Sequence, residues 1–121
     1  MLLTGKLYYD LAKERAARGL DGRVALVRIE ELSPFPFADV RAVLTRYAGA
    51  GEIVWVQEEP RNQGAWTHVG PRLDAVSESL GLGGGYIGLR GQEEAAVPVP
   101  GVASVYVPQQ KAIVDIALEG L

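Results

Sequence analysis

The sequence predicts an α/β fold in three layers, with a mostly parallel sheet that is flanked by helices on both faces. Strand-like and helix-like segments alternate four times along the 121 residues, which is the pattern of parallel strands joined by crossover helices. The segment 23–29 is nearly continuous in apolar residues, as is typical of a strand covered on both faces. Between the strands, apolar residues recur every three or four positions, which indicates helices with one buried face.

Periodicity and composition assign the individual elements. The expected strands are residues 2–4, 23–29, 52–56 and 86–89. The expected helices are residues 6–18, 40–47, 66–80 and 109–118. In the last helix we expect Ile113, Ile116 and Ala117 to point inward. We expect residues 1–121 to form a single domain, because no repeat, low-complexity tract or second periodic unit interrupts the alternation.

Glycine and proline mark the ends of these elements. Gly19 stands where a helix C-terminal cap belongs, and Pro34 and Pro36 keep residues 33–37 extended. Pro71 falls inside the third helical run, so that helix either begins near Pro71 or is kinked there.

Two further segments lack a regular period. The glycine-rich residues 81–85 follow a helix and open a strand, whereas a phosphate-binding loop follows a strand and opens a helix, so we predict a turn there. Residues 91–103 have no periodicity, and we expect an ordered meander or a lid.

Composition excludes several classes of function. The net charge is −3 and no cluster of Lys and Arg forms a basic stripe, so nucleic acid is not an expected partner. The absence of cysteine excludes disulfides and thiolate chemistry and fits an intracellular compartment. No apolar run reaches the roughly 20 residues of a membrane span. The first residues already resemble a strand, so we expect no targeting segment before the fold and a chain cut from a longer protein.

The sequence offers no self-sufficient catalytic centre. His68 is the only histidine and has no evident nucleophile to activate, so a packing role is favoured. The acidic pairs 30–31 and 58–59 follow strands, and helix N-terminal or interface roles are favoured over metal binding for them. No metal site is predicted. Three arginines could hold a phosphate or carboxylate, although ion pairing is the commoner role, namely Arg61, Arg72 and Arg90.

Polar residues just past the strands are the candidate contact residues. In an open α/β sheet, the carboxyl ends of the strands line the crevice in which ligands and partner surfaces meet. The residues expected to form an interdomain face or an effector pocket are Lys6, Arg28, Gln57, Glu58, Asn62 and Gln63. No catalytic residue is assigned. The two tryptophans, Trp55 and Trp66, are expected in the core or at the interdomain face.

Three stretches in register, residues 2–11, 28–37 and 55–66, carry a family resemblance, and residues 71–73 extend it. The third reads Trp-Val-Gln-Glu-Glu-Pro-Arg-Asn-Gln-Gly-Ala-Trp. Together they resemble the C-terminal domain of the thiamine-diphosphate-dependent decarboxylating component of 2-oxoglutarate dehydrogenase, and the related 2-oxoadipate dehydrogenase component has the same kind of domain. The tail departs from the family pattern, since residues 91–94 lack an Arg-Pro pair and Tyr106 stands in place of a histidine.

The resemblance implies a transketolase C-terminal-domain-like fold and a multidomain parent in the tricarboxylic acid cycle. That parent decarboxylates 2-oxoglutarate on thiamine diphosphate and Mg²⁺ and passes the succinyl group to the lipoyl acyltransferase component. The two preceding domains hold the cofactor, and this chain has no Gly-Asp-Gly motif, so we expect no cofactor in it. Implied partners are those domains and a second subunit of a homodimer.

Three functional hypotheses follow. The leading one is a non-catalytic C-terminal assembly and regulatory domain of such a dehydrogenase. The second is a freestanding nucleotide or acyl-CoA-binding regulatory module, and the third is an enzyme that uses His68 or the glutamate pairs. The sequence leaves open the choice between 2-oxoglutarate and 2-oxoadipate and whether Met1 is a natural start. The expected location is the cytoplasm for a bacterial source and the mitochondrial matrix for a eukaryotic one.

Overall fold

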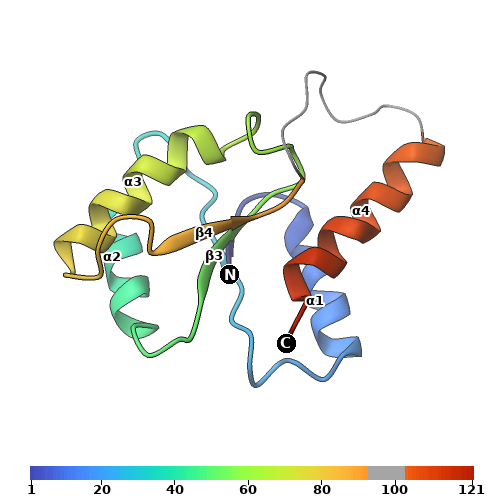
Figure 1. The fold of residues 1–121 in the computed structure, drawn as a ribbon, viewed down its shortest axis with the longest axis horizontal. Coiled ribbons are helices and arrows are strands. Elements are labelled where there is room, and N and C mark those ends of the chain that lie inside the picture. The colour runs from blue at the N-terminus through green and yellow to red at the C-terminus, as the bar shows by residue number, and fades with distance from the viewer. Residues whose placement is uncertain (93–102) are drawn as a thin grey trace.

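A computed structural model describes the backbone of residues 1–92 and 103–121 and the side chains of residues 1–92 and 111–121. Within that part of the chain it confirms the predicted fold class, a parallel sheet between two helical layers (Figure 1). The elements are β1 (Leu2–Leu3), α1 (Leu7–Ala17), β2 (Val27–Arg28), α2 (Phe37–Arg46), β3 (Ile53–Val56), α3 (Trp66–Ser79), β4 (Ile87–Arg90) and α4 (Ala103–Leu118).

The strands lie in the order β2-β1-β3-β4, and every neighbouring pair is parallel. Leu2 of β1 is in register with Val27 of β2 on one side and with Trp55 of β3 on the other. The chain therefore passes from β1 to an outer neighbour and then returns to the opposite side of β1. This reversal creates a topological switch point between β1 and β3, where ligand crevices form in open α/β sheets.

Two hydrophobic cores cover the two faces of the sheet. Leu2 and Trp55 face α2 and α3, where they pack with Leu73. Leu3 and Val54 face α1 and α4, which lie together on the other side in Figure 1. Because successive side chains of a strand point to opposite faces, the buried run of β1 and β3 supplies both cores at once.

The prediction of a long second strand, residues 23–29, was wrong. Only Val27–Arg28 pair as a strand, while the Val24 amide donates to the carbonyl of Leu20 at 3.0 Å in a turn. β2 is also an edge strand, and its Arg28 is exposed, so it is not covered on both faces. The segment is apolar because both of its ends are buried. Val24, next to the turn, packs into the core beside α1 and α4, and Ile29 packs into the core beside α2 and α3.

The two later helices differ from their predictions in detail. α3 begins at Trp66 and continues through Pro71, so the alternative in which it begins near Pro71 is wrong. α4 begins at Ala103 rather than at residue 109. Ile116 was expected inside but is 39% exposed, because α4 instead buries Ile113, Val114, Ala117 and Leu118.

The remaining predicted segments are a turn and an aperiodic stretch. Positive φ angles at Gly81, Gly83 and Gly85 confirm a tight turn before β4, since such angles strain residues with a Cβ. The expected meander or lid at residues 91–103 falls mostly on residues 93–102, which are outside the described residues. Among the residues that are described, none of the helices has the length and apolar character needed to cross a bilayer.

Candidate interdomain and effector site at the carboxyl edge of the sheet

Lys6 and Glu58 stand on the two sides of the topological switch point. Lys6 follows β1 and Glu58 follows β3, and the Lys6 ammonium lies 3.9 Å from a carboxylate oxygen of Glu58. The Lys6 side chain is 67% exposed and that of Glu58 is 18% exposed. The structure therefore brings together two of the predicted contact residues. The Lys6 side chain is exposed to solvent, and the Glu58 side chain is mostly buried.

Gln57 is the organising residue of the loop that follows β3. The residue is 3% exposed, and its side-chain amide oxygen accepts hydrogen bonds from the Trp55 indole Nε1 at 3.1 Å and the Trp66 backbone N at 2.9 Å. Its amide nitrogen lies 3.1, 3.0 and 2.9 Å from the carbonyl oxygens of Glu59, Pro60 and Gln63. A buried amide with this many partners fixes the path of residues 57–66.

Two glycines allow that loop to close. Gly64 has a φ of 66°, and a Cβ there would lie 2.8 Å from Oε2 and 2.9 Å from Cβ of Glu59. Gly91, just after β4, approaches the loop from the other side, and a Cβ would lie 3.1 Å from the Gln57 carbonyl oxygen. The loop is therefore held in one conformation by close approaches at these two glycines as well as by hydrogen bonds.

Arg28 forms an aromatic and cationic surface beside Lys6. Its guanidinium carbon lies 4.5 Å from the centre of the Tyr8 ring and 5.9 Å from that of Tyr9, and Nη1 donates to the Tyr9 hydroxyl at 3.4 Å. The two tyrosines meet edge to face, with ring centres 5.5 Å apart. Tyr9 is 64% exposed. Tyrosine and arginine in such an exposed arrangement are the residue types enriched at protein–protein interfaces.

Glu30 stabilises the start of α1 from the loop that follows β2. Its carboxylate accepts hydrogen bonds from the Gly5 backbone N at 3.2 and 3.3 Å and from the Thr4 hydroxyl at 3.4 Å. An anion at this position is favoured because the unpaired N–H groups of a helix N-terminus carry partial positive charge. One of the two favoured sequence interpretations of this acidic pair, a helix N-terminal role, therefore fits Glu30.

Asn62 and Gln63 lie at the far end of the same loop. Asn62 is exposed and lines a shallow groove of about 500 Å³ with Arg61 and with Trp66 of α3. Gly70 also lines this groove, and a Cβ there would be in van der Waals contact with the Trp66 ring at 3.4 Å. Gln63 is half-buried, and its carbonyl accepts one of the hydrogen bonds from Gln57. Trp66 is half-buried beside this groove, whereas Trp55 is fully buried.

The single histidine has a structural position. His68 Nε2 lies 2.7 Å from the carbonyl oxygen of Leu32, so Nε2 carries the proton and donates to that oxygen. The His68 carbonyl in turn accepts a hydrogen bond of 2.7 Å from Arg72. The hydrogen bond between His68 and Leu32 ties the loop before α2 to α3, as expected of a packing histidine.

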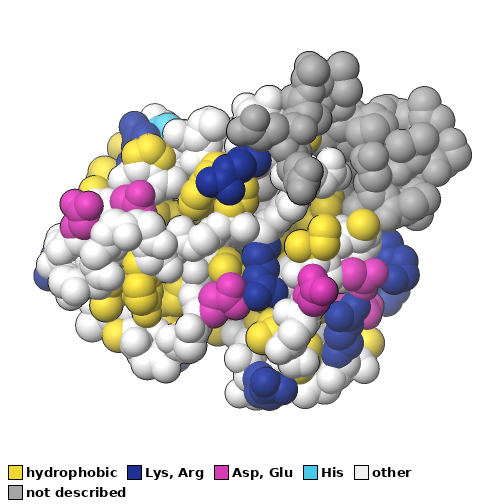
Figure 2. All heavy atoms as spheres, in the orientation of Figure 1, with side chains coloured by type: hydrophobic (Ala, Val, Ile, Leu, Met, Phe, Trp, Pro, Cys, Tyr) yellow, Lys and Arg dark blue, Asp and Glu magenta, His cyan; other side chains and the backbone are white. Residues whose placement is uncertain are grey.

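Most charged candidates have partners inside the fold. Arg90 donates to the carbonyls of Ile116, Ala117 and Glu119 at the end of α4 and forms an ion pair with Glu52 at 2.6 Å. On the face drawn in Figure 2, acidic and basic side chains are interspersed rather than gathered by sign. Within the described part of the chain, no three His, Asp or Glu side chains are grouped so that they could hold a metal ion.

Sequence reasoning did not place Tyr9 among the contact residues, and it considered Glu30 only for a helix N-terminal or interface role. The sequence does give a signal for each residue. Tyr9 follows Tyr8 on the first helix, and Glu30 follows the second strand. Their roles depend on pairing across strands, because residues 19 to 26 positions apart meet only when β1 and β2 lie side by side.

Comparisons with known protein sequences find a matching family and several similar proteins. The sequence model of the family described as 2-oxoglutarate dehydrogenase C-terminal matches residues 1–118. Three similar proteins are each named 2-oxoglutarate dehydrogenase E1 component. That of Coxiella burnetii is 40% identical over 121 residues, that of an Exiguobacterium species 43% over 117, and that of Brucella anthropi 40% over 118. These alignments cover 95–98% of this chain but only 12% of each relative.

Proposed function

The chain belongs to the 2-oxoglutarate dehydrogenase C-terminal family, and we propose that it acts as the non-catalytic assembly and regulatory domain of a longer E1 component. The family match over residues 1–118 carries this proposal. The geometry supports it, because the polar groups at the carboxyl edge of the sheet serve to order loops. Gln57 holds the loop after β3, and Glu30 holds the start of α1.

The longer enzyme, on this proposal, decarboxylates 2-oxoglutarate and passes the succinyl group to a lipoyl acyltransferase component. Thiamine diphosphate with Mg²⁺ supplies the carbanion chemistry in the domains that precede this one. The residues present here do not fit that cofactor. A Mg²⁺–diphosphate site needs a convergence of free oxygen ligands, whereas the carboxylates of Glu30 and Glu58 already face the start of α1 and Lys6.

A direct test of the non-catalytic role uses the chain by itself. We expect no decarboxylation when it is mixed with 2-oxoglutarate, thiamine diphosphate and Mg²⁺, and no protection of its amides by the cofactor. The same assay with a full-length E1 component from one of the relatives is the positive control. Turnover above the buffer rate by the 121-residue chain would overturn the proposal.

The partner surface is the patch of Tyr8, Tyr9 and Arg28, which we propose packs against the preceding domains or a second subunit of a homodimer. Its exposed tyrosine and stacked guanidinium have the chemistry of an interface anchor. The test is binding of this chain to the separately produced preceding domains. We expect Tyr9→Ala to weaken binding at least tenfold, while Lys13→Ala, an exposed change on the same helix, leaves it unchanged. Equal binding by both variants would assign the contact to another surface.

A second candidate function is an effector site at the switch point. It is favoured by one observation, the Lys6 side chain, which is 67% exposed at the crevice between β1 and β3. Calorimetric titration with AMP and with acetyl-CoA tests it, with Lys6→Ala as the variant and Lys13→Ala as the control. Heat that disappears only in Lys6→Ala supports an effector pocket, and the absence of heat at millimolar ligand leaves the assembly role alone.

The location of the protein follows from the same proposal. An E1 component works in the compartment of the tricarboxylic acid cycle, which is the cytoplasm of a bacterium or the mitochondrial matrix of a eukaryote. Fractionation of the source cells with an antibody to this domain tests it.

A further inference from the structure

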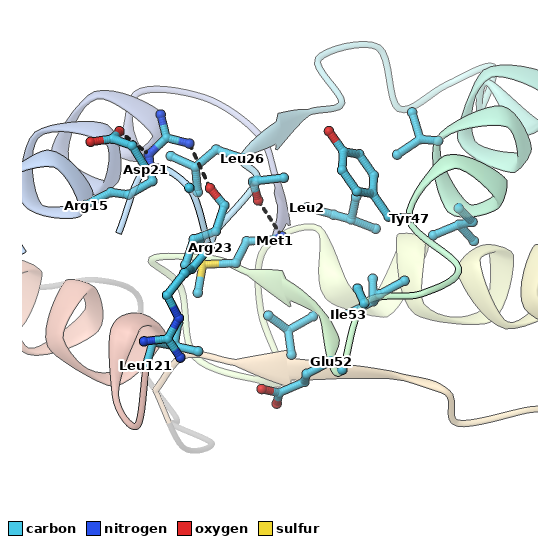
Figure 3. Close-up of a pocket in the computed structure, with 18 residues that line it drawn as sticks. Met1, Leu2, Arg15, Asp21, Arg23, Leu26, Tyr47, Glu52, Ile53 and Leu121 are labelled. Carbon is cyan, nitrogen blue, oxygen red and sulfur yellow. Dashed lines mark hydrogen bonds and ion pairs between the residues drawn. The ribbon is translucent and has the colours of Figure 1, made fainter. Parts of the chain in front are cut away.

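A cavity of about 780 Å³ lies at the amino edge of the sheet, opposite the edge described above. It opens between residues 24–26, which lead into β2, and residues 52–54, which begin β3 (Figure 3). Tyr47, at the end of α2, closes one side of it, and the ion pair between Arg15 and Asp21 closes the other, with 3.1 Å between Nε and the carboxylate. Met1 lies between these walls at the start of β1.

On the β2 side of the cavity, the backbone pairing between β1 and β2 could be extended by further residues before Met1. The Met1 amino group donates to the Ala25 carbonyl at 2.7 Å, and the Val27 amide donates to the Met1 carbonyl at 2.9 Å. These bonds continue the parallel ladder between β1 and β2 past the first residue of β2. The Ala25 amide faces the same direction as the Val27 amide, because strand residues two apart point alike, and it meets no backbone acceptor among the described residues.

On the β3 side of the cavity, the backbone could also pair with a residue placed before Met1. The Gln57 amide donates to the carbonyl of Arg90 in β4. By alternation along β3, the amides of Val54 and Val56 face the opposite neighbour, β1. Leu2 is in register with Trp55, so a residue placed directly before Met1 would be in register with Ile53 and within reach of the Val54 amide. The amides of Ala25 and Val54 therefore both border the space directly before Met1, one on each side.

We propose that this cavity receives an extended stretch of polypeptide that continues β1 on its amino side, namely the segment that joins this domain to the rest of the longer enzyme. The choice of this occupant rests on the proposed function. Its support is that the chain spans only 12% of its E1 relatives and matches a C-terminal family, so most of a relative's chain lies outside the matched region. Strand addition supplies main-chain hydrogen bonds on both sides, as in other cases in which a peptide completes a sheet.

The side chains around the cavity specify what the segment should contain. Leu2 belongs to the core beneath α2 and α3, so the residue directly before Met1 faces the same way, toward Leu44 and Tyr47. The residue before that faces the opposite side of the sheet, toward Arg15 and Asp21. We therefore expect an apolar residue directly before Met1 and a polar residue before that one.

The test compares the 121-residue chain with two extended forms. One carries Thr-Ser-Val before Met1 after a new initiator methionine, and the matched control carries Thr-Ser-Asp. Amide hydrogen exchange at Ala25 and Val54 is followed by NMR, together with the thermal midpoint. We expect the valine form to slow exchange of both amides at least tenfold relative to the unextended chain and to raise the midpoint, and the aspartate form to do neither.

Equal exchange in all three forms would overturn the inference. So would a concentration-dependent dimer of the unextended chain that the valine extension abolishes, because a second copy would then be the occupant. Slower exchange on addition of AMP or acetyl-CoA to the unextended chain would assign the cavity to a small molecule instead. None of these readouts involves the partner domains, so failure of the assembly role leaves this test intact, and the reverse also holds.

Discussion

The side-chain amide of Gln57 accepts a hydrogen bond of 3.1 Å from the indole of Trp55, which lies two residues earlier in the chain on β3, and both residues are buried. The same oxygen accepts the Trp66 amide, so one side chain joins the end of β3 to the start of α3. The polar residues that follow β3 therefore form a rigid loop around a buried amide, and the surface of that loop is what a partner meets.

Replacing Gln57 with Leu should destabilise the domain strongly. The substitution leaves the Trp55 indole and several backbone groups buried without partners, and each such group costs about 1–3 kcal/mol. We expect a loss of about 2–4 kcal/mol in the free energy of unfolding, measured by urea denaturation. The exposed substitution Glu31→Gln serves as a control and should change stability by less than about 0.5 kcal/mol. A Gln57→Leu chain as stable as the control would refute the structural role of this amide.

Replacing Gly64 with Ala should cost more than the same change at Gly19. Both glycines have φ near 70°, which costs a residue with a Cβ about 1–2 kcal/mol. Only at Gly64 does the added Cβ meet another group, Glu59, whereas nothing lies within 4 Å at Gly19. We expect the difference between the two variants to be about 1 kcal/mol or more in chemical denaturation. Equal losses would mean that Glu59 moves aside freely.

Removing the Arg90 side chain should loosen α4 from the sheet. Arg90 holds three carbonyls at the end of that helix, where the helix dipole favours a cation. We expect Arg90→Met to lower the free energy of unfolding by about 1–3 kcal/mol and to speed amide exchange in residues 113–118. Glu52→Gln, which removes only the partly exposed ion pair, should cost less than about 1 kcal/mol. A larger effect of Glu52→Gln than of Arg90→Met would contradict the capping role.

Stability should rise with pH as the Met1 amino group loses its proton. Burial of this group lowers its pKa below 8.0 in the folded chain, while the nearby Glu52 opposes the shift. Between the folded pKa and 8.0 the unfolded chain therefore binds more protons, so the free energy of unfolding increases with pH in that window.

Acetylation of Met1 should remove this slope. The acetylated nitrogen still carries a proton to donate to the Ala25 carbonyl, but it bears no charge. The measurement is thermal unfolding of the acetylated and free chains from pH 6 to pH 8.5. A slope that survives acetylation would show that another group titrates there.

The predictions from sequence were wrong for the elements whose extent or orientation depends on their neighbours in the fold. The apolar run 23–29 reads as one strand, yet only two of its residues find a partner in β1, because β1 itself is short. The spacing of apolar residues predicts that Ile116 is buried. Instead, the buried face of α4 is rotated so that it includes Val114 and Leu118 and leaves Ile116 partly exposed. Periodicity defines an apolar stripe on a helix, whereas the rotation of the helix is fixed by what it packs against.

By itself the sequence determined the alternation of strands and helices, the parallel sheet, the breaks at glycine, and the polar character of the strand ends, because these depend on short-range sterics and on hydrophobic period. Only the tertiary structure decided that Lys6 meets Glu58, that Arg28 stacks on Tyr8, and that Gln57 is buried. Those outcomes follow from the strand order β2-β1-β3-β4, which brings together residues far apart in the chain. Local preferences do not encode such contacts, since they form only when the sheet does.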